Sequence, residues 1–547
     1  MAKKFIFKQN QIIGAAAAES DEHFLSQCFV DNGSIDIIRH CNDPRHILIG
    51  RTGSGKSAII RRLVDYEDHV INIRPESLSL SYIANSNILN FFTEAGVKMD
   101  IFYRLLWRHV FCVELLKERF QINTEEKKKK FLDIIWSITS NNKSNENALE
   151  YLKKWGESFW QETEYRIKEV TTILEKELKA SVDGNIPGIA NLSGTAGRKL
   201  TEEQKEDVIH RAQEVVNKVQ IRELSTVMDM MNDILLSNQQ QKFFITIDKL
   251  DEDWIEDNLR FRLIRALIET SVDFFDRVKC VKIIIAIRSD LLDRIYRYTR
   301  DPGFQEEKYR TSSLDLSWTK KDLIEVLNTR IQLLVKEQYT NYQVTYKDLI
   351  VEKIGKQEAI DYILERTLMR PRDIINFFNT AIRLSDGKPT INKKAILEAE
   401  GIYSRERLRA LYDEWFGLYP NLDNFTTLLQ GRGQPFRLID ISNEELTENY
   451  LRLLISPQAH QGIDNDFAKM LFEGQIDIDT YRRNIVQILY KVGLIGLRTG
   501  SNLPISWSHI SGAGVSLSEI SNDTRIYIHP IFNRVFAIPL DIDIETI

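Results

Sequence analysis

Residues 50–57 read GRTGSGKS, and this glycine-rich stretch constrains the fold more than any other feature of the sequence. It fits the spacing G-x-x-x-x-G-K-[ST], which is typical of a loop whose backbone amides bind phosphate groups. Gly53 and Gly55 let the backbone turn tightly, so that successive N–H groups point into one concavity. Lys56 is placed to reach the β- and γ-phosphate oxygens of a nucleoside triphosphate, and Ser57 to ligate Mg²⁺.

The segments that flank this loop favour a phosphate site over a chance glycine-rich turn. The apolar run Ile47–Ile49 predicts a short buried strand, and Ser57–Leu63 predicts a helix whose N-terminus faces the phosphates. The residues that we expect to contact the nucleotide here are Gly50, Arg51, Thr52, Gly53, Ser54, Gly55, Lys56, Ser57 and Ala58.

A second apolar run, Phe243–Ile247, ends in Asp248 and predicts a strand that is buried on both faces of a sheet. The Asp248 carboxylate would hold Mg²⁺, usually through water. Hydrolysis of a nucleoside triphosphate also needs a carboxylate that activates the attacking water. The residue directly after Asp248 is Lys249 and not a glutamate, so this carboxylate must come from another position. Asp251 is our first choice for that catalytic role and Glu252 the second, although either could instead cap the next helix.

The apolar run Val281–Ile287 is followed by Arg288 and Ser289, either of which could sense the γ-phosphate from a strand end. Arg288 is our catalytic candidate, and a simple ion pair at the strand end is the alternative. One of the basic residues that follow could act on a neighbouring subunit's nucleotide, although a solvated loop is the favoured interpretation for each. They are Arg294, Arg297, Arg300, Lys308 and Arg310.

Five short apolar runs, near residues 47, 70, 244, 284 and 314, predict five strands with helices between most of them. Parallel strands joined by helical crossovers form an α/β fold, with the nucleotide at the carboxyl ends of the strands. We therefore predict a nucleotide-binding core with a five-stranded parallel sheet, formed by residues 1–84 and 241–320.

Three further regions are predicted around this core. Residues 85–240 would form a large helical insertion that serves as a lid, a partner-docking arm or an oligomer contact. Within it, Glu125–Lys130 is interpreted as a solvated helix face rather than a nucleic-acid patch, and residues 181–197 as a glycine-rich loop. Near the N-terminus, Gly14–Asp21 is expected to open a helix through Phe24, Leu25 and Phe29, which packs beside the sheet rather than touching the nucleotide.

Residues 321–420 are predicted to form a helical lid domain. Arg370-Pro371-Arg372 predicts the start of a helix, because proline suits the first helical position. Arg370 and Arg372 would lie beside the first turn of this helix, where their guanidinium groups could contact the phosphates. The alternative is a helix start with arginines on the surface.

Residues 421–547 follow the order helix, strand, long turn-rich segment and strand, which predicts a winged-helix-like domain. Such domains bind DNA or protein, and the two interpretations are equally favoured because the segment carries both basic and acidic residues. The basic residues that could touch DNA phosphates are Arg482, Arg483, Lys491 and Arg498.

Composition limits the setting in which the chain works. Its 547 residues are enough for roughly three or four domains, and 43% are hydrophobic. The net charge of −6 gives no overall field that attracts nucleic acid, although it is compatible with a local basic patch. The four cysteines form no C-x-x-C pair, which favours free thiols in a reducing cytosol. No run approaches the ~20 apolar residues of a membrane span, and no signal peptide is visible, so we expect a cytoplasmic protein without a membrane partner.

With these residues identified, the chain resembles a family of bacterial stand-alone P-loop ATPases. That family is allied to the KAP, STAND and origin-recognition branches of the AAA-like ATPases. The stretches that carry the resemblance are Gly14–Asp21, GRTGSGKSA at 50–58, IDKLDEDW at 247–254, IRSDLL at 287–292, LDLSW at 314–318, RPRDIINFFN at 370–379, YSRERLRALYDEW at 403–415 and IHPIFNRVF at 528–536. The resemblance implies an ASCE-type core, ATP as the nucleotide, a helical lid and a winged-helix-like C-terminal domain. Unlike KAP members the sequence has no membrane helices, and unlike STAND proteins it has no repeat array or effector domain.

Relatives in these branches act as switches, often in conflict systems such as anti-phage defence or in DNA transactions. We therefore expect a Mg²⁺-dependent ATPase that works as a conformational switch in defence. Its expected partners are a separate effector protein encoded nearby and, in a homo-oligomer, further copies of itself. One alternative is a DNA-binding ATPase of the loader or transposition type, using the C-terminal domain. Another alternative is a nucleotide-binding scaffold with little turnover. It is compatible with the sequence because Lys249, and not a glutamate, follows Asp248.

Overall fold

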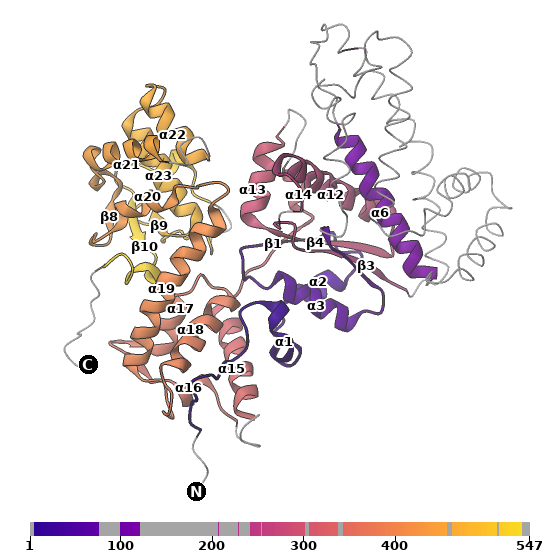
Figure 1. Ribbon diagram of the computed structural model, residues 1–547, viewed down its shortest axis with the longest axis horizontal. Coiled ribbons are helices and arrows are strands. Elements are labelled where there is room, and N and C mark those ends of the chain that lie inside the picture. The colour runs from indigo at the N-terminus through magenta and orange to yellow at the C-terminus, as the bar shows by residue number, and fades with distance from the viewer. Residues whose placement is uncertain are drawn as a thin grey trace, which may run out of the picture. The chain divides into compact units, whose positions relative to one another are not determined.

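The computed structural model describes residues 5–75, 99–120, 206, 228, 241–252, 254–300, 306–336, 343–456, 462–510 and 514–538. The chain divides into two compact units (Figure 1). The sheet unit comprises Gly33–Gly50 and Ile59–Asp315, and the helical unit comprises Met1–Asn32, Arg51–Ala58 and Leu316–Ile547. The charge run at 125–130, the glycine-rich stretch at 181–197 and most of the predicted insertion lie outside the described residues.

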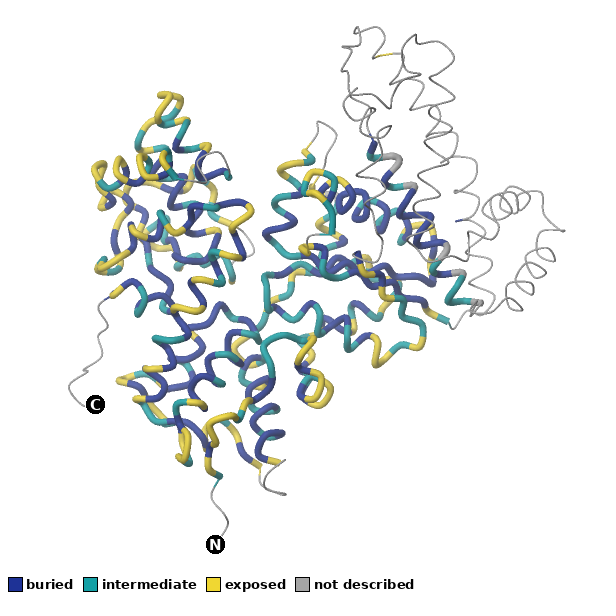
Figure 2. The backbone as a smooth tube through the Cα atoms, in the orientation of Figure 1, coloured by how far each residue is buried: buried dark blue, intermediate teal, exposed yellow. Residues whose placement is uncertain are grey.

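A five-stranded parallel sheet forms the centre of the sheet unit, which confirms the prediction from the apolar runs. Its strands are β1 (Ile47–Gly50), β2 (Val70–Ile73), β3 (Phe243–Ile247), β4 (Val281–Arg288) and β5 (Ser313–Asp315). They lie in the order β2-β3-β4-β1-β5, so that β4 separates β1 from β3. Every residue of β3 and the first seven of β4 are buried (Figure 2). Such continuous burial is typical of central parallel strands covered on both faces.

Helices cover both faces of this sheet. On one face lie α2 (Ser34–Arg39) and α3 (Lys56–Tyr66), and on the other α6 (Asp100–Phe120), α12 (Asp257–Arg277), α13 (Ser289–Tyr298) and α14 (Glu307–Arg310) (Figure 1). The buried Trp107 of α6 donates its indole N–H to the Leu263 carbonyl of α12 at 2.8 Å. The chain leaves β1 toward one face and leaves the neighbouring β4 toward the other. In open α/β sheets, ligands bind beyond the carboxyl ends of the strands at such a reversal.

The helical unit is built from short strands and many helices that share one hydrophobic core. Its helices are α1 (Glu22–Cys28), α15 (Lys320–Lys336), α16 (Tyr346–Leu349), α17 (Ala359–Glu365), α18 (Pro371–Arg383), α19 (Lys393–Trp415), α20 (Leu422–Thr426), α21 (Asn443–Ile455), α22 (Ile463–Phe472) and α23 (Ile478–Val492). The core runs without interruption from Leu327 and Phe378 in the first helices to Leu489 and Phe532 near the C-terminus, each fully buried. α18 begins with Pro371, as predicted from the sequence.

Two small antiparallel sheets complete the helical unit. One is the hairpin of β6 (Lys353–Ile354) and β7 (Gln357–Glu358). The other has three strands, β8 (Phe436–Arg437), β9 (Ile495–Arg498) and β10 (Arg525–Ile528), in the order β8-β10-β9. α23 leads into β9, and a long segment without regular strands separates β9 from β10, in the element order that the sequence predicted.

The N-terminal helix lies where the sequence predicts it, through Phe24 and Leu25, but it begins later than Gly14–Asp21 suggests. α1 begins at Glu22, after a short 3-10 turn at Ala18–Ser20. Gly14 has φ of +105°, outside the right-handed helical region. The N–H of Ala15 donates to the Asp21 carboxylate at 2.7 Å. These backbone groups are therefore committed to side-chain contacts that a helix would break.

None of the helices among the described residues is both long and apolar enough to cross a bilayer.

Candidate functional site

The predicted phosphate loop directly follows β1. Gly50 is the last residue of that strand, and Lys56, Ser57 and Ala58 are the first residues of α3. Gly53 has φ of +81° and Gly55 has φ of +100°, in the left-handed region where glycine carries no Cβ penalty. The two glycines therefore stand where the turn needs them.

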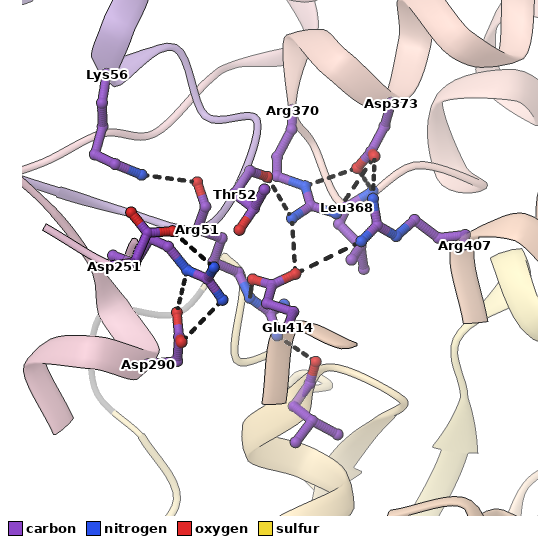
Figure 3. Close-up of polar contacts among 12 residues, drawn as sticks. Arg51, Thr52, Lys56, Asp251, Asp290, Leu368, Arg370, Asp373, Arg407 and Glu414 are labelled. Carbon is purple, nitrogen blue, oxygen red and sulfur yellow. Dashed lines mark hydrogen bonds and ion pairs between the residues drawn. The ribbon is translucent and has the colours of Figure 1, made fainter. Parts of the chain in front are cut away.

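Four consecutive carbonyl groups of the loop, those of residues 51–54, accept hydrogen bonds from donors in the same unit. Figure 3 shows the bonds to Arg51 and Thr52. The donors are Lys56 Nζ to the Arg51 carbonyl (3.2 Å), Arg370 Nη1 to that of Thr52 (2.8 Å), the Arg372 backbone N–H to that of Gly53 (3.5 Å) and Trp318 Nε1 to that of Ser54 (2.8 Å). In a trans peptide, the C=O and the N–H of the next residue point in opposite directions. Each donor therefore fixes a peptide plane and turns the following amide away from itself.

Two loop hydroxyl groups find no hydrogen-bond partner among the described residues. Thr52 Oγ1 and Ser54 Oγ are buried and make no hydrogen bond with the described residues. An unmade hydrogen bond of a buried hydroxyl costs about 1–3 kcal/mol. These groups therefore fit a polar ligand that approaches the loop.

Replacing Gly53 by alanine should destabilise the protein by more than the cost of placing an alanine in a left-handed backbone conformation. A Cβ at Gly53 would lie 2.6 Å from Arg372 Cβ, so Arg372 would have to move. Gly387 is the matched control, because it has φ of +72° with nothing within 4 Å of its Cβ position. Gly387→Ala should cost about 1–2 kcal/mol of unfolding free energy, and Gly53→Ala clearly more. Urea denaturation measures both, and equal costs would contradict the close packing of Arg372 on the loop.

A cluster of buried charges lies beside the loop (Figure 3). Asp373 is fully buried and accepts from Arg370 Nε at 2.8 Å. Arg407 lies 3.5 Å from Asp373 and 3.6 Å from Glu414. Glu414 also lies 3.7 Å from Arg370 and 3.9 Å from Arg51 of the loop. The loop is therefore tied electrostatically to α18 and α19.

The electrostatics of this cluster leave it positive. Burial works to raise the pKa of the Asp373 carboxyl, but Arg370 and Arg407 outweigh it and hold that pKa well below its usual value. Among these five side chains, Asp373 and Glu414 supply two negative charges, and Arg51, Arg370 and Arg407 supply three positive ones. An excess positive charge beside backbone amides favours an anionic ligand.

Arg51 also connects the loop to the C-terminal end of α23. Its Nη2 donates to the Val492 carbonyl, and its guanidinium lies 5.7 Å from the centre of the Trp415 ring. Gly493 follows with φ of +89°, and a Cβ there would lie 2.6 Å from Arg51 Nη1. A last-turn carbonyl carries the negative end of the helix dipole, which suits a guanidinium.

The predicted roles of Arg370 and Arg372 can be compared with their positions. Arg370 is 3% exposed, and its polar contacts are the loop backbone and the carboxylates described above. Arg372 donates from Nε to the Ala16 carbonyl at 3.0 Å. Burial and the neighbouring Arg370 lower the pKa of Arg372. Both residues thus contact the loop or the N-terminal segment, and their contact with phosphate stays a prediction.

In the sheet unit, Asp248 directly follows β3, as the apolar run predicted. Its Oδ1 accepts the N–H of Lys249 at 2.8 Å, and Lys249 has φ of +62°. Lys249 Nζ lies 3.1 Å from Glu252. Glu252 is therefore an ion-pair partner in this structure.

Arg288, at the end of β4, contacts two carboxylates. It donates to Asp251 at 2.9 Å and to both oxygens of Asp290 at 2.9 Å (Figure 3). Burial works to lower the pKa of Arg288, but Asp290 and Asp251 outweigh it and raise that pKa above its usual value. The structure thus joins two predicted catalytic residues, Arg288 and Asp251, in one ion pair. Of the basic residues that follow β4, Arg294 pairs with Asp257 at 2.6 Å.

Several residues that hold the loop have no role predicted from the sequence. Arg407 and Glu414 lie seven positions apart on α19, two turns along one helix face. The fully buried Leu411 lies on the same face. Charged residues on an otherwise buried helix stripe signal a buried ion pair, since unpaired charges are rarely buried. Trp318 carried no such signal, because its partner is a backbone carbonyl.

No group of three or more His, Cys, Asp or Glu side chains that could hold a metal occurs in the part of the chain that the structure describes. A nucleotide-bound Mg²⁺ does not need such a group. It keeps several water ligands and takes one or two carboxylates together with phosphate oxygens.

Two comparisons with known proteins bear on this chain. Residues 321–412 match the family model of the FunZ-associated C-terminal helical domain. Over 536 residues the chain is 23% identical to the putative transposon gamma-delta 80.3 kDa protein of Escherichia coli (strain K12). That match covers 96% of this chain and 67% of the relative. The first match falls on the segment that carries Arg370, Arg407 and the helices around them.

Proposed function

We propose that this chain binds ATP with Mg²⁺ at residues 50–57 and hydrolyses it. The observation that supports this proposal is that hydrogen bonds already fix the orientation of the peptide groups in the loop. Donors from Lys56, Arg370, Arg372 and Trp318 hold four successive carbonyls, and each such bond turns the next amide the other way. A loop that is already ordered binds a phosphate chain at a lower entropic cost.

The donor groups near the loop suit a triphosphate. Thr52 and Ser54 carry buried hydroxyls without partners among the described residues, and the surrounding cluster keeps one positive charge. Lys56 would bind the β- and γ-phosphates, and Ser57 and Asp248 are the residues that we expect to hold Mg²⁺. The metal, when bound, neutralises charge that develops on the phosphate oxygens.

The proposed work of the ATPase is that of a conformational switch. Arg51 connects the loop to α19 and α23, and Arg370 connects it to α18. A change in the loop on nucleotide binding or hydrolysis would alter these contacts and bias the arrangement of the helices. The defence role, the separate effector and the cytoplasmic location stay predictions from the resemblance.

The rate of ATP hydrolysis in two variants should identify the residue that activates the attacking water. If Asp251 does so, Asp251→Asn should lower Mg²⁺-dependent phosphate release by roughly 10²–10⁴-fold, with little change in ATP affinity. Glu252→Gln is the matched control, since it neutralises the adjacent carboxylate, and it should keep most of the activity. The opposite ranking would move the role to Glu252. A wild-type protein that binds ATP without releasing phosphate would favour a scaffold over an ATPase.

A second candidate function is that of a DNA-binding ATPase of the loader or transposition type. The name of the Escherichia coli relative, a putative transposon protein, favours it. This candidate would be supported if duplex DNA stimulates ATP hydrolysis and if the stimulation weakens as the salt concentration rises.

A further inference from the structure

Three arginines occupy directly opposed positions across the three-stranded C-terminal sheet. Arg525 of β10 is the register partner of Arg437 in β8 and of Arg498 in β9 (the strands are labelled in Figure 1). Neighbouring strands lie about 4.8 Å apart, so the row of three Cα atoms spans about 10 Å. We call Arg437, Arg525 and Arg498 the arginine row.

The arginine row lies on the outer face of the sheet. Side chains alternate between the two faces of a strand, and Ile526 and Ile528 of β10 are buried in the core. Arg525 therefore projects from the opposite face, and directly opposed residues share a face. Arg525 is exposed, the Arg437 side chain is 56% exposed, and Arg498 is partly exposed.

Like charges in directly opposed positions of a sheet destabilise it. The charges near the row compensate only part of this repulsion. Arg437 contacts Asp440 at 3.2 Å, and the exposed Asp523 lies two positions before Arg525 in the chain. Arg498 donates to the Ser501 carbonyl, which carries no net charge. An anion that lies along the row would bind all three guanidinium groups and relieve their repulsion.

The chemistry of the row favours a phosphate backbone. Guanidinium groups form paired hydrogen bonds with phosphate oxygens, and a rigid sheet holds the three at fixed spacing. Tyr527 is two residues beyond Arg525 on the same face, and a tyrosine hydroxyl is a common donor to nucleic-acid phosphates. Duplex DNA carries one negative charge per 1.7 Å of its axis, twice the density of one strand, and so gains most from a fixed row of cations.

We propose that the outer face of this sheet binds the sugar–phosphate backbone of duplex DNA through Arg437, Arg525 and Arg498. The proposal names a surface for the DNA-binding candidate function given above, and it requires no ATP hydrolysis. Of the contacts predicted from the sequence, the row keeps Arg498 and leaves out Arg482. Arg482 is 2% exposed and donates to the Ile441 carbonyl at 3.0 Å, so it lies inside the unit.

The test is fluorescence anisotropy of the full chain with a labelled 24-base-pair duplex, without nucleotide, over a series of salt concentrations. The variant replaces the whole arginine row with glutamine. Each phosphate contact contributes about −0.9 to the slope of log K against log salt, so loss of three should reduce the slope by up to about 2.7. We expect affinity at low salt to fall at least about tenfold, and Arg525→Lys alone to retain most of it.

The charge-matched control removes three other exposed positive charges of the same unit, with Arg452→Gln, Lys353→Gln and Lys356→Gln. It should leave affinity and slope close to those of the wild type. Because the arginine row is self-repelling, its glutamine variant should melt at an unchanged or higher temperature, which excludes misfolding as the cause of lost binding.

Three results would overturn the proposal. The first is that the wild-type chain does not bind the duplex at low salt. The second is that the two triple variants lose equal affinity for the duplex. The third is that the arginine row binds polyglutamate but not duplex DNA. Repeating the titration with Lys56→Ala separates this proposal from the proposed ATP site, because DNA binding without nucleotide should survive that change.

Discussion

Asp373→Ala is expected to cost the helical unit about 3–5 kcal/mol of folding free energy, because it leaves buried charges without their partner. Asp373 is fully buried, accepts from Arg370 at 2.8 Å and lies 3.5 Å from Arg407. It also accepts the N–H of Leu368 at 3.1 Å. Urea unfolding followed by tryptophan fluorescence measures the change.

The control for this substitution is Glu448→Ala, which removes a carboxylate that is 67% exposed and paired with Arg452. Exposed pairs of this kind contribute about 0–1 kcal/mol. A cost for Asp373→Ala no larger than that of Glu448→Ala would contradict the buried-cluster account.

The same carboxylate predicts an acid response. The pKa of Asp373 is lower in the folded protein than in the unfolded chain, where aspartate titrates near about 3.9. Its contribution to stability is therefore complete above about pH 4 and lost as pH falls toward the lowered pKa. Between about pH 4 and pH 2, the stability of Asp373→Ala should fall less steeply than that of the wild type.

Lys56→Ala is expected to reduce Mg²⁺-dependent phosphate release by roughly 10²–10³-fold, the range seen when one charge-stabilising donor is removed from an active site. Lys56 is 9% exposed, and its Nζ rests on the Arg51 carbonyl at 3.2 Å. On binding of ATP, the ammonium group would exchange this neutral carbonyl for phosphate oxygens, with which hydrogen bonds are stronger. Phosphate release over time, measured with saturating ATP, provides the rate.

Lys353→Ala is the matched control, because it removes the same charge from the exposed hairpin of β6 and β7. It should leave the rate unchanged. Equal activity of Lys56→Ala and Lys353→Ala would place hydrolysis, if observed, at another site.

The strands and the loop could be predicted because their signals are local. β3 and β4 are continuous apolar runs of the length of a buried strand, and the glycines of the loop stand at the two left-handed positions. Pro371 marked the first residue of α18 for the same reason. Signals of this kind lie within a few residues of the feature they predict.

The partners of the loop could not be predicted, because they come from distant parts of the chain. Arg370 meets the carbonyl of Thr52 across 318 positions, and Arg51 meets that of Val492 across 441. The first residue of α1 could not be predicted for a related reason. The Gly14 carbonyl accepts a hydrogen bond from Asn379, 365 positions away, and so takes no part in the helix. Local propensity carries no information on such contacts.

The arginine row illustrates a third case. Of its three members, the sequence suggests only Arg498 as a DNA contact, and it is the register of β8, β10 and β9 that aligns Arg498 with Arg437 and Arg525. Arg482 is another of the four basic residues that the sequence suggests as phosphate contacts, but helix α23 buries its side chain. The face of a helix that packs inward depends on elements that periodicity alone does not identify.

Calorimetric titration of the full chain with ATP and Mg²⁺, alongside the Lys56→Ala variant, tests whether residues 50–57 form the nucleotide site. We predict one saturable site per chain and an affinity at least about 100-fold weaker in the variant, since the lost charge-assisted hydrogen bonds are worth about 1.5–3 kcal/mol each. Equal ATP affinity in the two proteins, or no binding by the wild type, would contradict the assignment of residues 50–57 as the nucleotide site.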